Sequence, residues 1–173
     1  MRKNAITMMG NPLTLAGNEL KVGDQAPDFQ VVDQDLKPVK FSGSQGKLTL
    51  ILSVPSLDTS VCSRETRRFN EEVAKIGNQV RALTISMDLP FAQKRWCGSE
   101  GIESLQVLSD YQFADFGNKY GVLIHELRLL ARSVFIIDQK GVIKYIHLVK
   151  EVTEEPPYQE VMKNLSELLS GVK

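Results

Sequence analysis

Cysteine and histidine are scarce in this sequence of 173 residues, which contains two of each. Two cysteines are too few for a disulfide framework, and they lack the Cys-x-x-Cys spacing of many metal sites and dithiol redox motifs. With so few thiol and imidazole groups, we expect no structural zinc site and no other bound metal or cofactor. Cys62 and Cys97 are therefore either inert core thiols or a redox pair, and their number alone leaves both readings open.

An excess of one charge and a long apolar run are also missing. Lysine plus arginine equals aspartate plus glutamate at 21 each, so no electrostatic feature favours nucleic acid or an anionic membrane surface as a partner. No apolar run approaches the roughly 18 residues that indicate a transmembrane helix. The N-terminus begins with basic residues, but Gly10, Asn11 and Pro12 interrupt the apolar stretch that a signal peptide needs. We expect a cytoplasmic protein that binds neither nucleic acid nor membrane.

The composition is that of one globular domain. Hydrophobic residues make up 42% and charged residues 24% of the chain, which is ordinary for a folded domain. The chain is long for one core and short for two. It has no internal repeat, low-complexity tract or linker long enough to divide it. We therefore expect a single domain over residues 1–173.

Apolar strands alternate with amphipathic helices along the chain. We predict strands at 5–9, 13–17, 29–33, 48–54, 80–86, 105–109, 133–138 and 142–149, and helices at 60–76, 90–97, 111–120 and 158–169. Turn signals lie at 10–12, 42–46 and 138–141. This order predicts an α/β fold with a thioredoxin-like central mixed sheet, helices on both faces and an N-terminal β-hairpin.

Cys62 lies where a buried strand gives way to a helix, in the stretch SVPSLDTSVC. With Thr59 as N-cap, Cys62 falls in the first helical turn, where unpaired N–H groups and the helix dipole favour a thiolate. Pro55 ends the strand and can shield the sulfur from water. The Thr59 hydroxyl can donate to the thiolate and accept from a protonated substrate oxygen. Because α/β sheets place sites at the carboxyl ends of strands, these features favour a reactive thiol over an inert one.

Two segments carry a resemblance to a known family. The segment PSLDTSVC, ending at Cys62, matches the Pro-x-x-x-Thr-x-x-Cys signature of the peroxiredoxins, which are cysteine-dependent peroxidases on a thioredoxin-like fold. The segment SMDLPFAQKRWCG around Cys97 resembles the region of the resolving cysteine in bacterial thiol peroxidases, an atypical two-cysteine subfamily. The resemblance covers nearly the whole chain, from the N-terminal hairpin to the last helix.

The resemblance implies a role for five residues. Cys62 would be the peroxidatic cysteine, oxidised to a sulfenic acid by hydrogen peroxide and organic hydroperoxides. Cys97 would resolve it through an intramolecular disulfide, which thioredoxin would reduce. Thr59 would hydrogen-bond the substrate oxygen, Pro55 would shield the site, and Arg132 matches the family's active-site arginine. A guanidinium at that place would stabilise the thiolate and hold the peroxide in line. The resemblance also implies a homodimer.

Each assignment has a structural alternative. Arg132 could be a solvated residue at a strand entrance, and Thr59 could serve only as an N-cap. Phe91 and Trp96 could belong to a core that buries Cys97, or form an apolar collar for alkyl hydroperoxides. Two other functions share part of the chemistry. One is a peroxide sensor that passes oxidation to a partner, and the other is a thioredoxin-like disulfide oxidoreductase, which the missing Cys-x-x-Cys disfavours.

The disulfide cycle also predicts movement. A disulfide tolerates a Cα separation of only about 4.4–6.8 Å, and two cysteines on different elements need not begin that close. We therefore expect the first turn after Thr59 and the segment near Cys97 to unwind partly on oxidation.

Overall fold

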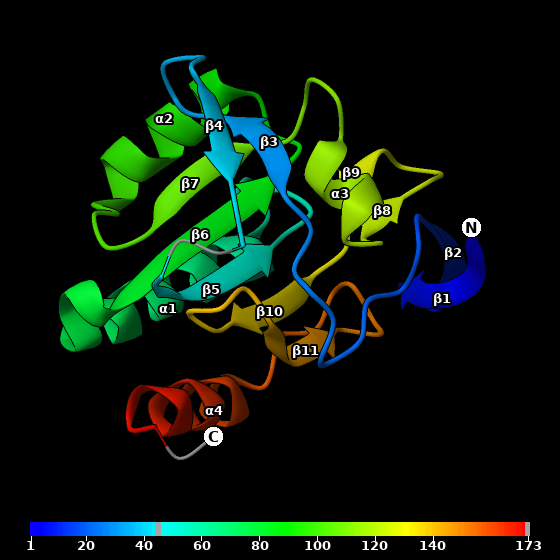
Figure 1. The fold of residues 1–173 in the computed structure, drawn as a ribbon. Helices are drawn as coiled ribbons and strands as arrows, with labels where there is room; N and C mark the ends of the chain where they lie inside the picture. Colours follow the sequence, from blue (N-terminus) through cyan, green and yellow to red (C-terminus); the bar gives the residue numbers. More distant parts are fainter. Residues whose placement is uncertain (44–45, 172–173) are drawn as a thin grey trace.

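A mixed β-sheet forms the centre of the molecule in the computed structural model, which describes residues 1–43 and 46–171 (Figure 1). Within those residues the sheet has seven strands in the order β11-β10-β5-β6-β7-β3-β4. These strands are β3 (Phe29–Val32), β4 (Pro38–Phe41), β5 (Leu48–Ser53), β6 (Val80–Ser86), β7 (Gln106–Ser109), β10 (Ser133–Ile137) and β11 (Ile143–Leu148). Strands β5, β6 and β7 are parallel, and the other pairings are antiparallel.

Helices and a second sheet cover the two faces of the central sheet. The helices are α1 (Ser60–Ile76), α2 (Pro90–Glu100), α3 (Asp115–Lys119) and α4 (Tyr158–Leu169), with a short 3-10 turn at Gly77–Gln79. Helices α1 and α4 bury Phe69, Val73 and Leu165 against one face of β5, β6 and β10. No helix among residues 1–43 and 46–171 is long and apolar enough to cross a membrane.

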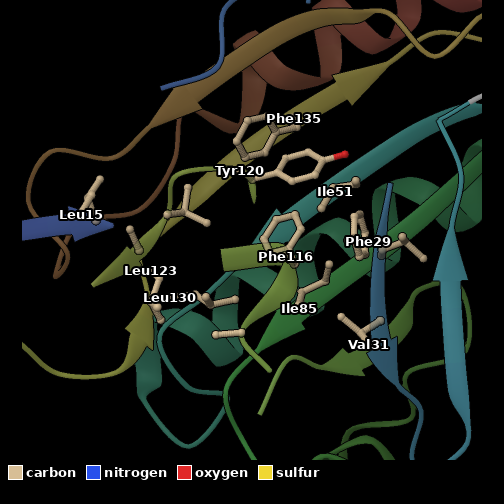
Figure 2. Close-up of a cluster of buried hydrophobic side chains, with 14 of the residues drawn as sticks. Leu15, Phe29, Val31, Ile51, Ile85, Phe116, Tyr120, Leu123, Leu130 and Phe135 are labelled. Carbon is tan, nitrogen blue, oxygen red and sulfur yellow. The ribbon is translucent and has the colours of Figure 1, made fainter. Parts of the chain in front are cut away.

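The opposite face is packed by α3 and by aromatic side chains. Figure 2 shows Phe29, Phe116, Tyr120 and Phe135 meeting in this cluster. Phe116 and Tyr120 are stacked with ring centroids 4.6 Å apart, and Tyr120 meets Phe135 edge-to-face at 5.1 Å. Offset-stacked and edge-to-face pairs are the favoured arrangements of aromatic rings. Both faces of the sheet are therefore covered, which explains why every residue of β5 is buried, Thr49 and Ser53 included.

An N-terminal hairpin forms the second sheet with two short strands. Strands β1 (Arg2–Met8) and β2 (Asn11–Ala16) are antiparallel, and β8 (Leu123–Ile124) and β9 (Leu129–Leu130) extend the sheet in the order β1-β2-β8-β9. The hairpin turn lies at Met9 and Gly10, whose φ angles of 50° and 80° are those of a type I′ turn. The carboxylate of Glu151 accepts hydrogen bonds from both backbone N–H groups of this turn.

The α/β fold class, the thioredoxin-like sheet and the N-terminal hairpin are confirmed, with corrections to some elements. The turn predicted at 10–12 lies one residue earlier, and Pro12 is part of β2. Helix α2 continues to Glu100, whereas α3 starts only at Asp115, after Ala114 adopts a left-handed φ of 49°. Strands β4, β8 and β9 were not predicted. The turn predicted at 42–46 lies partly outside the described residues, which omit 44 and 45.

The strand order determines where α1 and α2 begin. Strands β5 and β6 are parallel neighbours, with Ser53 opposite Ile85 near their carboxyl ends. Helix α1 follows β5 after a short loop, and α2 follows β6 in the same way. The N-termini of the two helices that carry the cysteines therefore lie at one edge of the central sheet.

Candidate active site

Cys62 is the third residue of α1, and its side chain has no solvent-exposed surface. Thr59 is the N-cap residue, with the extended φ and ψ angles of −90° and 146° that such a position requires. The thiol therefore lies in the first helical turn, where the unpaired backbone N–H groups attract negative charge. Val54 and Leu57 pack against Cys62 and belong to the same small hydrophobic cluster.

The loop between β5 and α1 fixes the Thr59 side chain. The Thr59 hydroxyl donates to the backbone oxygen of Ser56 at 2.9 Å, and the Thr59 N–H donates to the same oxygen at 3.1 Å. The hydroxyl makes no capping hydrogen bond to the helix. Because its one proton points to Ser56, the Thr59 oxygen offers only lone pairs to a further partner. Pro55 is buried at the start of this loop.

Arg132 is buried at the same edge of the sheet, with 2% of its surface exposed. Strand β10 is antiparallel to β5 and pairs Ser133 with Ser53, so the residue before Ser133 lies at the carboxyl end of β5. The guanidinium donates to the backbone oxygen of Val152 from Nε at 3.2 Å and from Nη2 at 3.0 Å. Nη1 donates to Glu65 Oε2 at 2.5 Å. Arg132 is therefore not the solvated strand-entrance residue that was the alternative.

Three charged or polar groups influence one another here. Burial lowers the pKa of Arg132, but the charges of Glu65 and Cys62 and their hydrogen bonds raise it, and the net pKa lies above the ordinary value. The guanidinium therefore stays charged; it is hydrogen-bonded to the Glu65 carboxylate and interacts electrostatically with Cys62. A permanent positive charge and a helix N-terminus thus face one buried thiol.

Glu65 was not predicted as a site residue. It lies one turn after Cys62 on α1, its exposed fraction is zero, and Oε1 has no hydrogen-bond partner in the described residues. Burial raises the pKa of Glu65 to about 7, while the charge and hydrogen bond of Arg132 lower it. A signal existed in the sequence, since Glu65 shares the apolar helix face of Cys62 and Phe69. A charged residue on such a face needs a partner.

Cys97 lies on α2 and packs against the hydrophobic cluster that contains Cys62. Both described cysteines are free thiols. The side-chain amide of Gln34 donates to Cys97 Sγ at 3.3 Å. Burial raises the pKa of the Cys97 thiol, and the Gln34 hydrogen bond lowers it in part. The fold therefore brings the two cysteines to one cluster, with Cys97 in the half-buried position.

The two aromatic residues of α2 have different surroundings. Trp96 is buried beside Cys62, and its Nε1 donates to Ser63 Oγ on α1 at 3.2 Å. Phe91 is 66% exposed at the start of α2 and is therefore not part of the core. Trp96 thus ties the helix that carries Cys97 to the first turns of the helix that carries Cys62.

The chemical capacity of this site lies in its thiols. No group of three or more His, Cys, Asp or Glu side chains within residues 1–43 and 46–171 could hold a metal ion. A thiolate at Cys62 would face the Arg132 guanidinium, which can also bind an oxygen atom that becomes negatively charged. A second thiol on a neighbouring helix could form a disulfide with the first. The arrangement suits two-electron oxidation at sulfur.

Comparison with known proteins gives consistent results. The Redoxin family model matches residues 21–162. A thiol peroxidase of Oceanobacillus iheyensis is 52% identical over 161 residues, covering 93% of this chain and 98% of the relative. A thiol peroxidase of Bacillus subtilis is 52% identical over 155 residues, covering 90% and 92%.

Solved structures agree with the fold. A peroxiredoxin-like protein from Aquifex aeolicus shares 46% identity with a TM-score of 0.90, over 97% of this chain and 99% of that one. A thiol peroxidase from Chromobacterium violaceum superposes with a TM-score of 0.83 over 96% and 98% of the two chains. Its identity of 20% supports the shared fold alone.

Proposed function

This chain belongs to the Redoxin family and to its thiol peroxidases, and from this premise we propose that Cys62 is the peroxidatic cysteine of a two-cysteine cycle. The observation that carries the proposal is the buried Cys62 thiol in the first turn of α1, near enough to the buried, charged Arg132 for the two groups to interact electrostatically. A helix N-terminus and a guanidinium both favour the thiolate, which is the nucleophilic form.

The first step transfers one oxygen atom from the substrate to sulfur. The Cys62 thiolate attacks the terminal oxygen of a hydroperoxide, so that an S–O bond forms and the O–O bond breaks. The departing hydroxide or alkoxide takes up a proton and leaves as water or an alcohol, and Cys62 becomes a sulfenic acid. Arg132 stabilises the negative charge that develops on the departing oxygen. The lone pairs of Thr59 accept a hydrogen bond from the protonated peroxide oxygen.

The second step closes the disulfide. The Cys97 thiol loses its proton and its thiolate attacks the Cys62 sulfur, so that an S–S bond forms and the S–O bond of the sulfenic acid breaks. The departing hydroxide takes up a proton and leaves as water. Thioredoxin then reduces the disulfide by thiol exchange and is itself oxidised. The raised pKa of Cys97 keeps this thiol protonated at neutral pH, so it does not compete with Cys62 for peroxide.

Burial of the site requires a local opening during the cycle. Cys62 has no exposed surface, so the covering side chains must move before a peroxide or a reductant reaches the sulfur. Pro55, itself buried, keeps water away from the thiolate in the closed form. Glu65 holds Arg132 in place through the buried ion pair.

The cellular setting and the assembly complete the proposal. We place the enzyme in the cytoplasm, where thioredoxin is kept reduced, and we expect it to work as a homodimer. Leu89 and Phe91 next to the site are 52% and 66% exposed, and exposed apolar side chains of this kind favour association between protein surfaces.

The test is turnover with thioredoxin, thioredoxin reductase and NADPH, with hydrogen peroxide and cumene hydroperoxide as substrates. Cys62→Ser should abolish peroxide consumption with both substrates, because no other thiol faces Arg132. Cys97→Ser should form the sulfenic acid once per chain and then stop, because thioredoxin has no disulfide to reduce. Full thioredoxin-coupled turnover by Cys97→Ser would contradict the resolving role. A single turnover in the wild type would instead indicate a peroxide sensor.

A further inference from the structure

Asp88 lies at the carboxyl edge of the central sheet, between the end of β6 and the start of α2. Its carboxylate contacts the loop that precedes α1. Oδ1 accepts a hydrogen bond from Ser56 Oγ at 2.6 Å, and Oδ2 accepts one from the Leu57 N–H at 2.8 Å. Oδ2 also accepts from Ser86 Oγ at 2.7 Å. One carboxylate therefore binds two consecutive residues of a loop that is far away in the sequence.

Ser56 is hydrogen-bonded both to Asp88 and to Thr59. Its backbone oxygen accepts both the Thr59 N–H and the Thr59 hydroxyl, and its own hydroxyl accepts the Asp58 N–H at 3.2 Å. The loop is thus held by two sets of hydrogen bonds: one within the loop, between Thr59 and Ser56, and one to Asp88 outside the loop. Without the hydrogen bonds to Asp88, Ser56 and Thr59 could move together relative to Cys62 while the hydrogen bonds between them stay intact.

The same network reaches the helix that carries Cys97. Ser86 Oγ, which donates to Asp88, accepts a hydrogen bond from Gln93 Nε2 at 3.1 Å. Gln93 is buried on α2, one turn before Cys97, and also donates to the backbone oxygen of Leu108 at 2.8 Å. Asp88 therefore stands between the two segments that must rearrange in the catalytic cycle.

We propose that Asp88 is a positioning residue for the peroxidase reaction, because its carboxylate holds the loop of Ser56 and Leu57 and thereby fixes the Thr59 oxygen relative to Cys62. This inference rests on the proposed role of Thr59 in binding the peroxide. Rate depends steeply on such placement, since a displacement of about 1 Å can cost on the order of a hundredfold. Alkylation of the same thiol needs the thiolate but no oriented hydroxyl. The two reactions should therefore respond differently to the loss of the carboxylate.

The test compares Asp88→Asn with the wild type in two reactions at Cys62. Asparagine has the same shape, but its amide group replaces one acceptor oxygen by a donor and removes the negative charge. The hydrogen bonds from Ser56, Leu57 and Ser86 to the carboxylate therefore cannot all keep their present direction, and those that remain lose the strengthening effect of the charge. Reaction with hydrogen peroxide is followed by rapid mixing, acid quenching and mass spectrometry of the Cys62 peptide. Reaction with iodoacetamide is followed in the same way. We expect Asp88→Asn to slow the peroxide reaction by about tenfold or more and to change alkylation by less than about twofold.

Two further variants control for general effects on folding. Ser109→Ala removes a hydrogen bond to the backbone oxygen of Asp88 and leaves the carboxylate contacts in place, so both rates should stay close to the wild type. Ser56→Ala removes the contact to Oδ1 and the hydrogen bond that Ser56 Oγ accepts from the Asp58 N–H, but it keeps the Leu57 and Ser86 contacts of the carboxylate, so it should slow the peroxide reaction by a smaller factor, about threefold. Ser56→Ala also keeps the proposal testable if Asp88→Asn does not fold.

Several outcomes would overturn the inference. Wild-type peroxide rates in Asp88→Asn, or in Ser56→Ala where only that variant folds, would show that the carboxylate does not position the loop. An equal loss in both reactions would show that Asp88 supports only the thiolate or the fold. A wild-type enzyme that alkylates at Cys62 but does not react with peroxide would refute the proposed function itself, and the Asp88 role with it.

Discussion

Glu65 and Arg132 form a buried ion pair. Removing either side chain would leave the other as an unpaired buried charge, which destabilises the fold. The two side chains have exposed fractions of 0% and 2%. Taking a charge out of water costs several kcal/mol, and only an opposite charge with good hydrogen bonds offsets this. Glu65 brings a carboxylate into the core beside Cys62, and its raised pKa reports that desolvation outweighs the attraction of Arg132. Glu65 therefore affects both the stability of the fold and the position of the positive charge beside Cys62.

The free energy of unfolding should depend on pH because Glu65 has a raised pKa in the folded protein. Its pKa is raised from 4.5 to about 7 in the folded state. Between those two values the folded protein holds a proton that the unfolded chain has released. The free energy of unfolding should therefore fall as pH rises through this window, by at most about 3 kcal/mol. Urea unfolding at a series of pH values measures the slope.

Substitution at Glu65 separates this effect from other titrations. Glu65→Gln cannot titrate, so the slope between pH 4.5 and about 7 should become flatter than in the wild type. Glu71→Gln, on the exposed face of the same helix, should keep the wild-type slope. A wild-type slope in Glu65→Gln would contradict the assignment.

Cys97 should make disulfide closure dependent on pH. Burial raises the pKa of its thiol, and only the thiolate attacks the Cys62 sulfenic acid. The rate of closure should therefore increase as pH rises above neutral. Gln34→Leu removes the hydrogen bond that favours the thiolate, so closure at any given pH should become slower. Quenched-flow mass spectrometry measures the rates, and Gln159→Leu on an exposed helix turn is the control. A closure rate independent of pH would contradict this account.

The sequence was sufficient to predict features that depend on neighbouring residues, such as the start of a helix. It was not sufficient to predict contacts between residues that are far apart in the chain. The position of Thr59 and Cys62 at the start of α1 was predicted from the N-cap preference of threonine next to a buried strand, although the Thr59 hydroxyl binds the Ser56 oxygen and not the helix. The pairing of Glu65 with Arg132 spans 67 positions, and the contact of Asp88 with Ser56 spans 32. Single-sequence patterns contain no information about which distant polar groups meet.

Helix α1 and helix α2 carry the two cysteines of the proposed cycle. Both start at the carboxyl edge of the sheet, and the hydrogen bond from Trp96 to Ser63 joins them. The segment that holds Cys62 lies in a regular helix whose bounds, Ser60–Ile76, are those expected from the sequence. Amphipathic spacing and the stop at Gly77 were sufficient for this prediction. Strands β8 and β9, with two residues each, are too short to produce a periodic pattern.

Oxidation should unwind the first turn of α1 and part of α2. The disulfide demands close approach of two Cα atoms, and the fixed position of Cys62 at the third residue of α1 opposes it. Hydrogen exchange of the reduced and disulfide forms should show faster exchange in residues 60–66 and 93–100 after oxidation. Helix α4, which packs against the central sheet away from the two cysteines, serves as an internal control with unchanged exchange. Unchanged protection in both cysteine segments would contradict the prediction.

The candidate active site lies outside the two large hydrophobic cores of the molecule. Two large clusters of buried hydrophobic residues lie on the two faces of the central sheet. Cys62 belongs to a third and much smaller cluster, formed with Val54, Leu57, Trp96 and Val107 at the sheet edge. A rearrangement there disturbs few buried contacts, so local opening can occur while both large cores stay folded. This division is consistent with the proposed cycle, in which the buried Cys62 thiol has to become accessible for exchange.

The intramolecular disulfide between Cys62 and Cys97 is best tested by peptide mapping after one equivalent of hydrogen peroxide has reacted with the fully reduced protein. The proposed cycle predicts one product, in which a disulfide within one chain joins the peptide of Cys62 to the peptide of Cys97. Thioredoxin should return this product to two free thiols. A Cys62 sulfinic acid beside a free Cys97, or a disulfide only between two different chains, would contradict the proposed cycle.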